Sequence, residues 1–357
     1  MGRSKRCCVA VLWLAAAVPV LAQTADSRLI DAVARDDVAM VRTLLTSRVD
    51  VNAAAADGAT ALHRAAQRDN AEIAGLLLAA GANARATTRY NITPLYHAAL
   101  NGNPALIARL LDAGADPNGV SHEGQTVLMT AALAGRADAV RLLLTRGARA
   151  DDVEPYKGQT ALMWAAAEGN TDAAAVLIEG GASVKAKSMG GLTPFLFAVR
   201  NAHKATAELL LARGADVNDV APDGTSALGM AVVNAYFELA SMLLDRGADP
   251  NLPDPRASPL HTIAWLRKPG ADGAAGVGAT PHGPPPVTGN VISLQLARKL
   301  LERGANPNVR VDWREATFGK EGGTARNPPN IQLGRHLLSY IGATPFYVAA
   351  KNGVAPM

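Results

Sequence analysis

The chain of 357 residues has only two cysteines, Cys7 and Cys8, and both lie near its N-terminus. Basic residues precede them, an apolar run continues to Val18, and small residues end the segment at Ala22. This order is typical of a cleaved export signal. The alternative is an uncleaved membrane anchor, but the apolar run is shorter than the ~20 residues that span a bilayer. We therefore predict a signal peptide at 1–22, cleavage after Ala22, and an exported protein, periplasmic or secreted.

Cleavage would leave a chain without cysteine, which excludes disulfides, thiol chemistry and cysteine-ligated metals. The formal net charge of +4 includes the three basic residues of the signal, so the mature chain carries 4 − 3 = +1. A charge so close to zero gives no electrostatic reason to expect binding to nucleic acid. We predict no nucleic-acid partner.

The sequence also lacks a pattern of catalytic or metal-binding residues. Its seven histidines are dispersed, with no H-E-x-x-H motif and no pair four residues apart. The one charged cluster in the irregular C-terminal part, Asp312, Arg314 and Glu315, offers no paired groups on a rigid element. We predict no catalytic residue, no metal and no cofactor; an enzyme with its site in this part is the least favoured alternative.

A repeat of about 33 residues fills most of the remaining chain. Its opening residue is always Ser or Thr, and the first seven steps between openers are 33, 33, 33, 34, 33, 33 and 32 residues. The step of 34 adds one residue near 152–156. A Gly-Ala pair follows each opener at a fixed distance through most of the chain. The openers are Ser27, Thr60, Thr93, Thr126, Thr160, Thr193, Ser226, Ser258 and Thr344.

The residue types within one period predict two helices. Ser or Thr is a favoured N-cap, and a proline directly after it, as at Pro94, suits the first helical position. A pair of small residues such as Ala165 and Ala166 lets neighbouring helices approach closely. A glycine such as Gly181 suits the left-handed position that ends a helix. Each period is therefore predicted to be a helix, a tight turn and a second helix.

These residues resemble the ankyrin repeat, whose T-P-L-H-x-A pattern stands in part as Thr-Pro-Leu at 93–95 and as Ser-Pro-Leu-His at 258–261. The resemblance covers about 26–353. It implies an all-α repeat solenoid with short β-hairpin fingers and about eight and a half repeats. It also implies a protein that binds other proteins without doing chemistry. His63 and His261 stand at the histidine of the pattern, for which the resemblance implies a structural hydrogen bond.

The repeat divides the predicted solenoid, 23–357, into parts. We expect an N-terminal capping repeat at 26–52, where Arg48 replaces the final glycine, and regular repeats at 53–257. The eighth repeat, 258–343, carries insertions at 269–290 and about 309–341, and an incomplete ninth repeat occupies 344–357. An array that stops within a repeat favours truncation, so the alternative function is that of a structural or regulatory segment of a larger exported polypeptide.

Functional residues are expected where the repeat imposes no requirement. The residue before each pair of small residues is such a position, and three successive repeats place large apolar side chains there. We predict an exposed stripe on the concave face that binds a protein partner, aided by side chains at the finger tips and acting as a monomer. The alternative is that the stripe packs between repeats as core. The predicted binding residues are Trp164, Phe197, Met230 and His97 on the helices, and Tyr90, Tyr156 and Met189 on the fingers.

Overall fold

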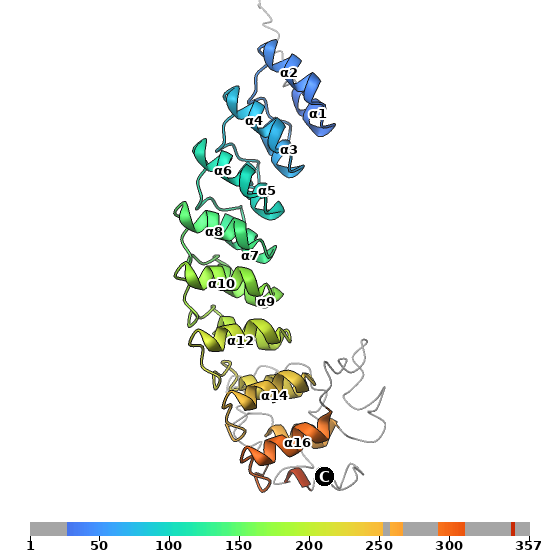
Figure 1. Ribbon diagram of the computed structural model, residues 1–357, viewed down its shortest axis with the longest axis vertical. Coiled ribbons are helices and arrows are strands. Elements are labelled where there is room, and N and C mark those ends of the chain that lie inside the picture. The colour runs from blue at the N-terminus through green and yellow to red at the C-terminus, as the bar shows by residue number, and fades with distance from the viewer. Residues whose placement is uncertain (1–26, 253–257, 267–291, 311–343, 347–357) are drawn as a thin grey trace, which may run out of the picture.

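The computed structural model describes residues 27–252, 258–266, 292–310 and 344–346. These residues form sixteen α-helices, which stack in consecutive pairs into an elongated solenoid (Figure 1). The predicted all-α repeat solenoid is confirmed. The predicted signal peptide, the insertion at 269–290, nearly all of the insertion at 309–341 and most of the ninth repeat lie outside the described residues.

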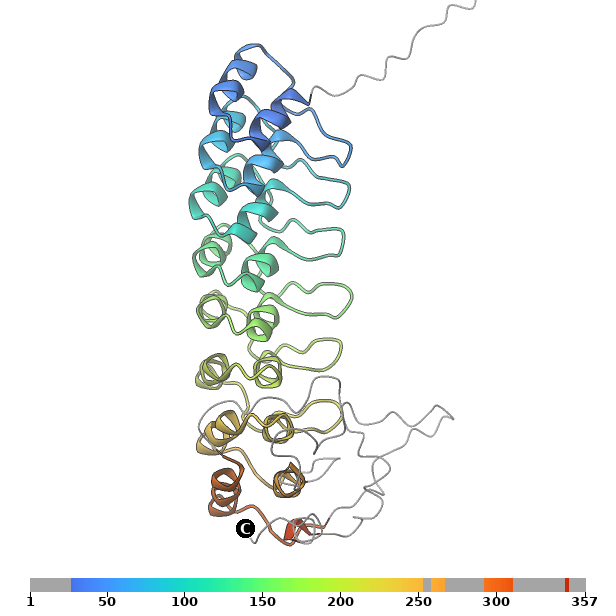
Figure 2. The same ribbon diagram turned by 90° about the vertical axis from the view of Figure 1, so that its right-hand side faces the viewer.

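The first helix of each pair lies beside a row of projecting loops, and the second lies on the opposite side (Figure 2). We call the first the finger-side helix, the second the outer helix, and the loops fingers. The finger-side helices are α1 (Arg28–Ala34), α3 (Ala61–Gln67), α5 (Pro94–Asn101), α7 (Val127–Leu133), α9 (Ala161–Glu168), α11 (Pro194–Arg200), α13 (Ala227–Val233) and α15 (Pro259–Leu266). The outer helices are α2 (Val38–Thr46), α4 (Ala71–Ala79), α6 (Pro104–Asp112), α8 (Ala137–Thr145), α10 (Thr171–Glu179), α12 (Lys204–Ala212), α14 (Phe237–Asp245) and α16 (Ser293–Glu302).

The helix boundaries follow the predicted capping residues. Thr160 is the N-cap of α9, and its Oγ1 accepts the backbone N–H of Met163 at 3.3 Å. The final glycines adopt the left-handed conformation, with φ of 95° at Gly181. In the first repeat Arg48 takes this conformation with φ of 53°, which a residue with a Cβ adopts at a cost of about 1–2 kcal/mol.

Apolar side chains of successive pairs form one continuous core. The second residue of each regular finger-side helix is a large apolar residue, as at Leu62 and Phe195, and both of these are fully buried. The small pairs, such as Ala165 and Ala166, are also fully buried and set the close helix spacing. A single pair cannot cover its apolar face, so stacking on its neighbours supplies the core. Within the described ranges, no helix combines the length and apolar character needed to cross a membrane.

Asparagines at the start of the fingers join consecutive repeats. Asn118 Nδ2 donates to the carbonyl of Gly147 at 3.0 Å, and its Oδ1 accepts the N–H of Arg149 at 2.9 Å. Asn251 makes the equivalent bond to the carbonyl of Gly304 at 2.9 Å. Since α15 contacts α13 and α16 contacts α14, the eighth pair keeps the frame of the solenoid despite the long segment between its helices.

The fingers also stack on one another. The N–H of His122 donates to the carbonyl of Tyr90 at 2.8 Å, and that of Met189 donates to the carbonyl of Lys157 at 2.8 Å. Isolated antiparallel bridges, such as that between Val120 and Thr126, close three of the fingers, but the described residues form no β-strand. Backbone bonds of this kind therefore link neighbouring fingers at several junctions of the solenoid.

Candidate functional site

The regular stacking is interrupted in the finger that precedes α9, residues 152–160, which we call the α9 finger. Here the step between openers is 34 residues, and the extra residue near 152–156 lies in this finger, before α9 begins. The carboxylate of Glu154 fills this larger loop: it accepts the N–H groups of Tyr156 at 2.7 Å, Lys157 at 3.0 Å and Gln159 at 3.0 Å. Burial favours the neutral form of Glu154, but these three donors outweigh it, so the pKa of Glu154 is lowered.

The α9 finger also stacks differently on the preceding finger, residues 119–126, which we call the α7 finger. In the links described above, the donor lies 32 residues after the acceptor. The residue 32 positions after Glu123 is Pro155, which has no N–H to donate. Its ring lies against Gly124, where a Cβ would approach Pro155 Cδ to 2.2 Å. Ring packing therefore replaces the backbone bond between these two fingers, as it does again where the ring of Pro222 lies against Gly191.

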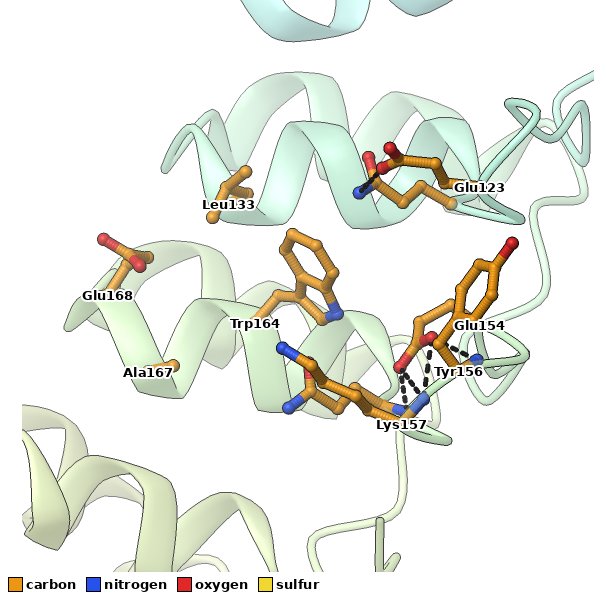
Figure 3. A pocket seen from close by; sticks show the side chains of 10 residues that line it. Glu123, Leu133, Glu154, Tyr156, Lys157, Trp164, Ala167 and Glu168 are labelled. Carbon is orange, nitrogen blue, oxygen red and sulfur yellow. Dashed lines mark hydrogen bonds between the residues drawn. The ribbon is translucent and has the colours of Figure 1, made fainter. Parts of the chain in front are cut away.

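A groove of about 480 Å³ lies at this junction. The two fingers form one wall, and α7 and α9 form the other (Figure 3). The groove is open to solvent, and its lining combines apolar, amide and charged side chains. The lining residues are Glu123, Gln125, Leu133, Glu154, Tyr156, Lys157, Gln159, Trp164, Ala167 and Glu168.

Trp164 lies at the centre of this groove, on α9 below α7 (Figure 3). Its side chain is partly buried and packs against the core. The indole Nε1 is buried and has no hydrogen-bond partner among the described residues. Leaving a buried donor unpaired costs about 1–3 kcal/mol, so this orientation of the Trp164 side chain lowers the stability of the fold. Glu168 lies one helical turn further along α9, on the same side of the helix as Trp164.

Three of the predicted binding residues are exposed on the fingers. Tyr90, Tyr156 and Met189 keep 54%, 69% and 70% of their surface accessible. Tyr156 lines the groove with Trp164, whereas Tyr90 and Met189 lie on the fingers before and after the junction. The guanidinium of Arg89 lies 4.9 Å from the centre of the Tyr90 ring, so one face of this ring is already covered.

The predicted exposed stripe is wrong at two of its three members. Phe197 is only 3% exposed and Met230 only 8%. Arg200, three residues after Phe197 on α11, places its guanidinium 4.8 Å from the centre of the phenyl ring. Met230 lies on α13, which is enclosed between α11 and α15. Both side chains belong to the core, and of the stripe only Trp164 borders a groove.

His97 is partly buried on α5 and does not line the groove. Its ring meets that of Tyr96 edge-on, with centroids 6.2 Å apart. Burial, followed by the nearby His63 and Arg64, lowers the pKa of His97 to about 4. His97 is therefore neutral at physiological pH and lies two repeats before Trp164.

His63 has the structural role that the resemblance implies. The backbone N–H of Thr60 donates to its Nδ1 at 3.1 Å, so Nε2 carries the proton and donates to the carbonyl of Ile92 at 3.0 Å. Burial is the main reason that the pKa of His63 is lowered. This histidine thus joins a helix N-terminus to the next finger.

The described residues hold a second hollow, of about 400 Å³, between α12 and α14. Its charges are already paired: Lys204 lies 3.2 Å from Glu238, and Arg246 lies 4.0 Å from Glu208. No group of three or more His, Cys, Asp or Glu residues in the described ranges could hold a metal ion. The groove at Trp164 is therefore the better candidate for a binding site.

Several residues of the groove were not predicted from the sequence. Glu168 could have been identified, because a residue four positions after Trp164 shares its helix face. Glu123 and Lys157 could not, since they reach the groove through the stacking of two fingers. The extra residue in the α9 finger was the one available signal that this junction differs from the others.

The repeat is also recognised by comparison with protein families. The model of ankyrin repeats (three copies) matches residues 29–121, 98–188 and 185–254. Together these matches cover 29–254 without a gap, which is more than half of the chain. A search of curated proteins found no match. The helix pairs, the fingers and the family match lead to one conclusion: the chain belongs to the ankyrin-repeat family.

Proposed function

We propose that this protein binds a protein partner through the groove around Trp164 and the neighbouring finger tips. The single observation that carries the proposal is the groove itself, which lies where the α9 finger departs from the regular stacking. Aromatic side chains in a hollow supply much of the binding energy in protein interfaces. Trp164 and Tyr156 provide two such side chains here. The family is generally an interaction scaffold, which supports a binding role and no catalytic one.

The partner would cross the groove between the finger-side helices and the fingers. Partly buried Trp164 would form the floor, and exposed Tyr156 would cover one side. Tyr90 and Met189 would extend the contact to the neighbouring fingers. Phe197 and Met230 would act only through the core, by keeping α11 and α13 in place.

The test is a comparison of proteins captured by the purified chain and by its variants. We expect Trp164→Ala and Tyr156→Ala to lose the same partners in quantitative mass spectrometry. Tyr156 is exposed, so its variant separates lost binding from lost folding. Met40→Ala, which removes an exposed side chain from α2, is the matched control and should keep the partners. If all three variants keep the wild-type partner set, the groove is not the binding site.

We also propose that the chain acts as a monomer outside the cytoplasm, without binding nucleic acid. The support is the sequence at 1–22 and the small net charge that remains after its removal. Mass spectrometry of the protein from its natural host should show a chain that begins at Gln23. A full-length chain in the cytoplasmic fraction would contradict the export proposal.

A further inference from the structure

The chain itself shows how one of its aromatic side chains is covered by a cation. In α11, Arg200 lies one turn after Phe197, and its guanidinium is 4.8 Å from the centre of the ring. A guanidinium over an aromatic face is attracted by the negative charge of the π-system. Phe197 is thereby shielded on the side where the repeat would otherwise leave it open.

The preceding repeat has the same arrangement without the cation. Subtracting the 33-residue step places Trp164 at the position of Phe197 and Ala167 at that of Arg200. Ala167 is too short to cover the indole, and both residues line the groove. The space that Arg200 fills over Phe197 is thus part of an open groove over Trp164, whose indole is the better partner for a cation.

The charges around this space favour a positive occupant. Glu123 and Glu168 form no ion pair in the described part of the chain, and Glu123 accepts only a long bond of 3.3 Å from Gln125. The carboxylate of Glu154 is occupied by backbone donors. Lys157 is the one cation in the lining, so the groove has two carboxylates without an ion pair and only one ammonium group.

Three arginines on this side of the solenoid already have partners. Arg64 lies 3.2 Å from Asp57, and Arg89 and Arg200 lie over their own aromatic rings. The groove at Trp164 therefore has two unmet features. No arginine covers the indole, and within the described chain no cation forms an ion pair with Glu123 or Glu168. An arginine side chain of a binding partner could both stack on the indole and form ion pairs with the carboxylates.

We propose that the groove recognises an arginine side chain of the partner, held in an extended segment. Its guanidinium stacks on the indole of Trp164, in the place that Arg200 occupies over Phe197. Glu123 and Glu168 accept its N–H groups from the two ends of the groove. This inference rests on the proposed function, because it names the chemistry of what the same groove binds.

The experiment uses peptides displayed on phage, panned against the purified chain. We expect the enriched peptides to share an arginine and to be lost when panning is repeated against Trp164→Ala or Tyr156→Ala. Peptides that depend on these aromatic residues but share no arginine would overturn the inference and leave the proposed function standing. If no peptide depends on either residue, both fail.

One enriched peptide then serves as a fluorescent probe for affinity. We expect Glu123→Gln and Glu168→Gln each to weaken its binding by about 5-fold, in line with a partly exposed charge contact. Glu179→Gln removes an exposed carboxylate from α10 in the same repeat and should change binding less than 2-fold. If Glu123→Gln and Glu168→Gln bound the peptide as tightly as the control Glu179→Gln, the role of the two carboxylates would be contradicted.

A last variant tests the position of the guanidinium. Ala167→Arg places the chain's own arginine where α11 has Arg200, so it should fill the space and weaken the probe at least 10-fold. Replacing the peptide's arginine by citrulline, which keeps the shape but removes the charge, should weaken it similarly. Unchanged binding to Ala167→Arg would show that the peptide does not use the face of Trp164.

Discussion

The buried carboxylate of Glu154 offers the sharpest test of how the irregular finger is built. It is 4% exposed, and its two oxygens accept three backbone N–H groups. Oε2 serves Tyr156 and Lys157, whereas Oε1 serves Lys157 and Gln159. Glu154→Gln keeps the shape of the side chain but turns one of these oxygens into an NH2 group, which can only donate.

The magnitude follows from counting the bonds that remain. With its oxygen in the place of Oε2, glutamine keeps the bonds from Tyr156 and Lys157, but the N–H of Gln159 then faces another donor. The backbone N–H of Gln159 loses its acceptor and the new NH2 group has none, and each buried unsatisfied group costs about 1–3 kcal/mol. The remaining bonds also lose the strength that the negative charge gives them. We expect a total cost of about 2–6 kcal/mol, confined mainly to the α9 finger.

Hydrogen exchange and urea unfolding at pH 7.5 measure this cost. The amides of Tyr156, Lys157 and Gln159 should lose protection in Glu154→Gln, while those of α7 and α9 keep most of theirs. Glu168→Gln, which changes an exposed carboxylate in the same groove, should stay within about 0.5 kcal/mol of wild type. Unchanged protection of the three amides would refute the assignment of Glu154 as the centre of this finger.

The pH dependence gives the same experiment a second readout. The pKa of Glu154 is lowered in the folded chain, so its contribution to stability is present above the pKa of an unfolded glutamate, about 4.3. It is lost as the pH falls through the lowered folded pKa. The advantage of wild type over Glu154→Gln should therefore shrink in acid.

Three further predictions concern the scaffold. Phe197→Ala should lower the free energy of unfolding by about 3–5 kcal/mol in urea titrations, because it removes a buried ring. A change under about 0.5 kcal/mol, which is typical of an exposed residue, would contradict the burial of Phe197. Stability should fall as the pH drops from about 6.5 toward 4, since the lowered pKa of His97 lets the unfolded chain bind the proton first. His97→Gln should reduce this loss by about 2 kcal/mol at pH 5 in thermal melts, and an equal loss in both proteins would refute it. Arg48→Gly should raise stability by roughly 1 kcal/mol, because glycine adopts the left-handed conformation without a Cβ clash, and a lower melting temperature would count against this reasoning.

Much of the fold could be predicted from the sequence because its rules are local. Thr160 caps a helix and Gly181 ends one through interactions within a few residues of the same segment. These signals repeat with a fixed period, so the pairing of helices into a solenoid followed from them. Even the conformation of Arg48, which has no glycine to signal it, could be read from its place in the period.

The binding surface could be predicted only in part, because exposure depends on neighbours outside the pattern. Trp164 and Phe197 hold the same position in their repeats, yet only Trp164 borders a groove. The difference arises one turn later, where Ala167 leaves the indole open and Arg200 covers the phenyl ring. The repeat pattern allows any residue type at this position, but it does not determine whether that residue is exposed. Its burial depends on the side chains of the adjacent helical turns.

A strictly periodic solenoid would present the same surface at every repeat and could not fix where a partner binds. Specific binding therefore requires a place where the period is broken. The described part of this chain has such a place, in which the extra residue around Glu154 and the short side chain of Ala167 coincide. The first alters the finger and the second uncovers Trp164, so changes in separate segments act on one groove. Restoring the regular finger by deleting one residue of the α9 finger should consequently impair binding even with Trp164 intact.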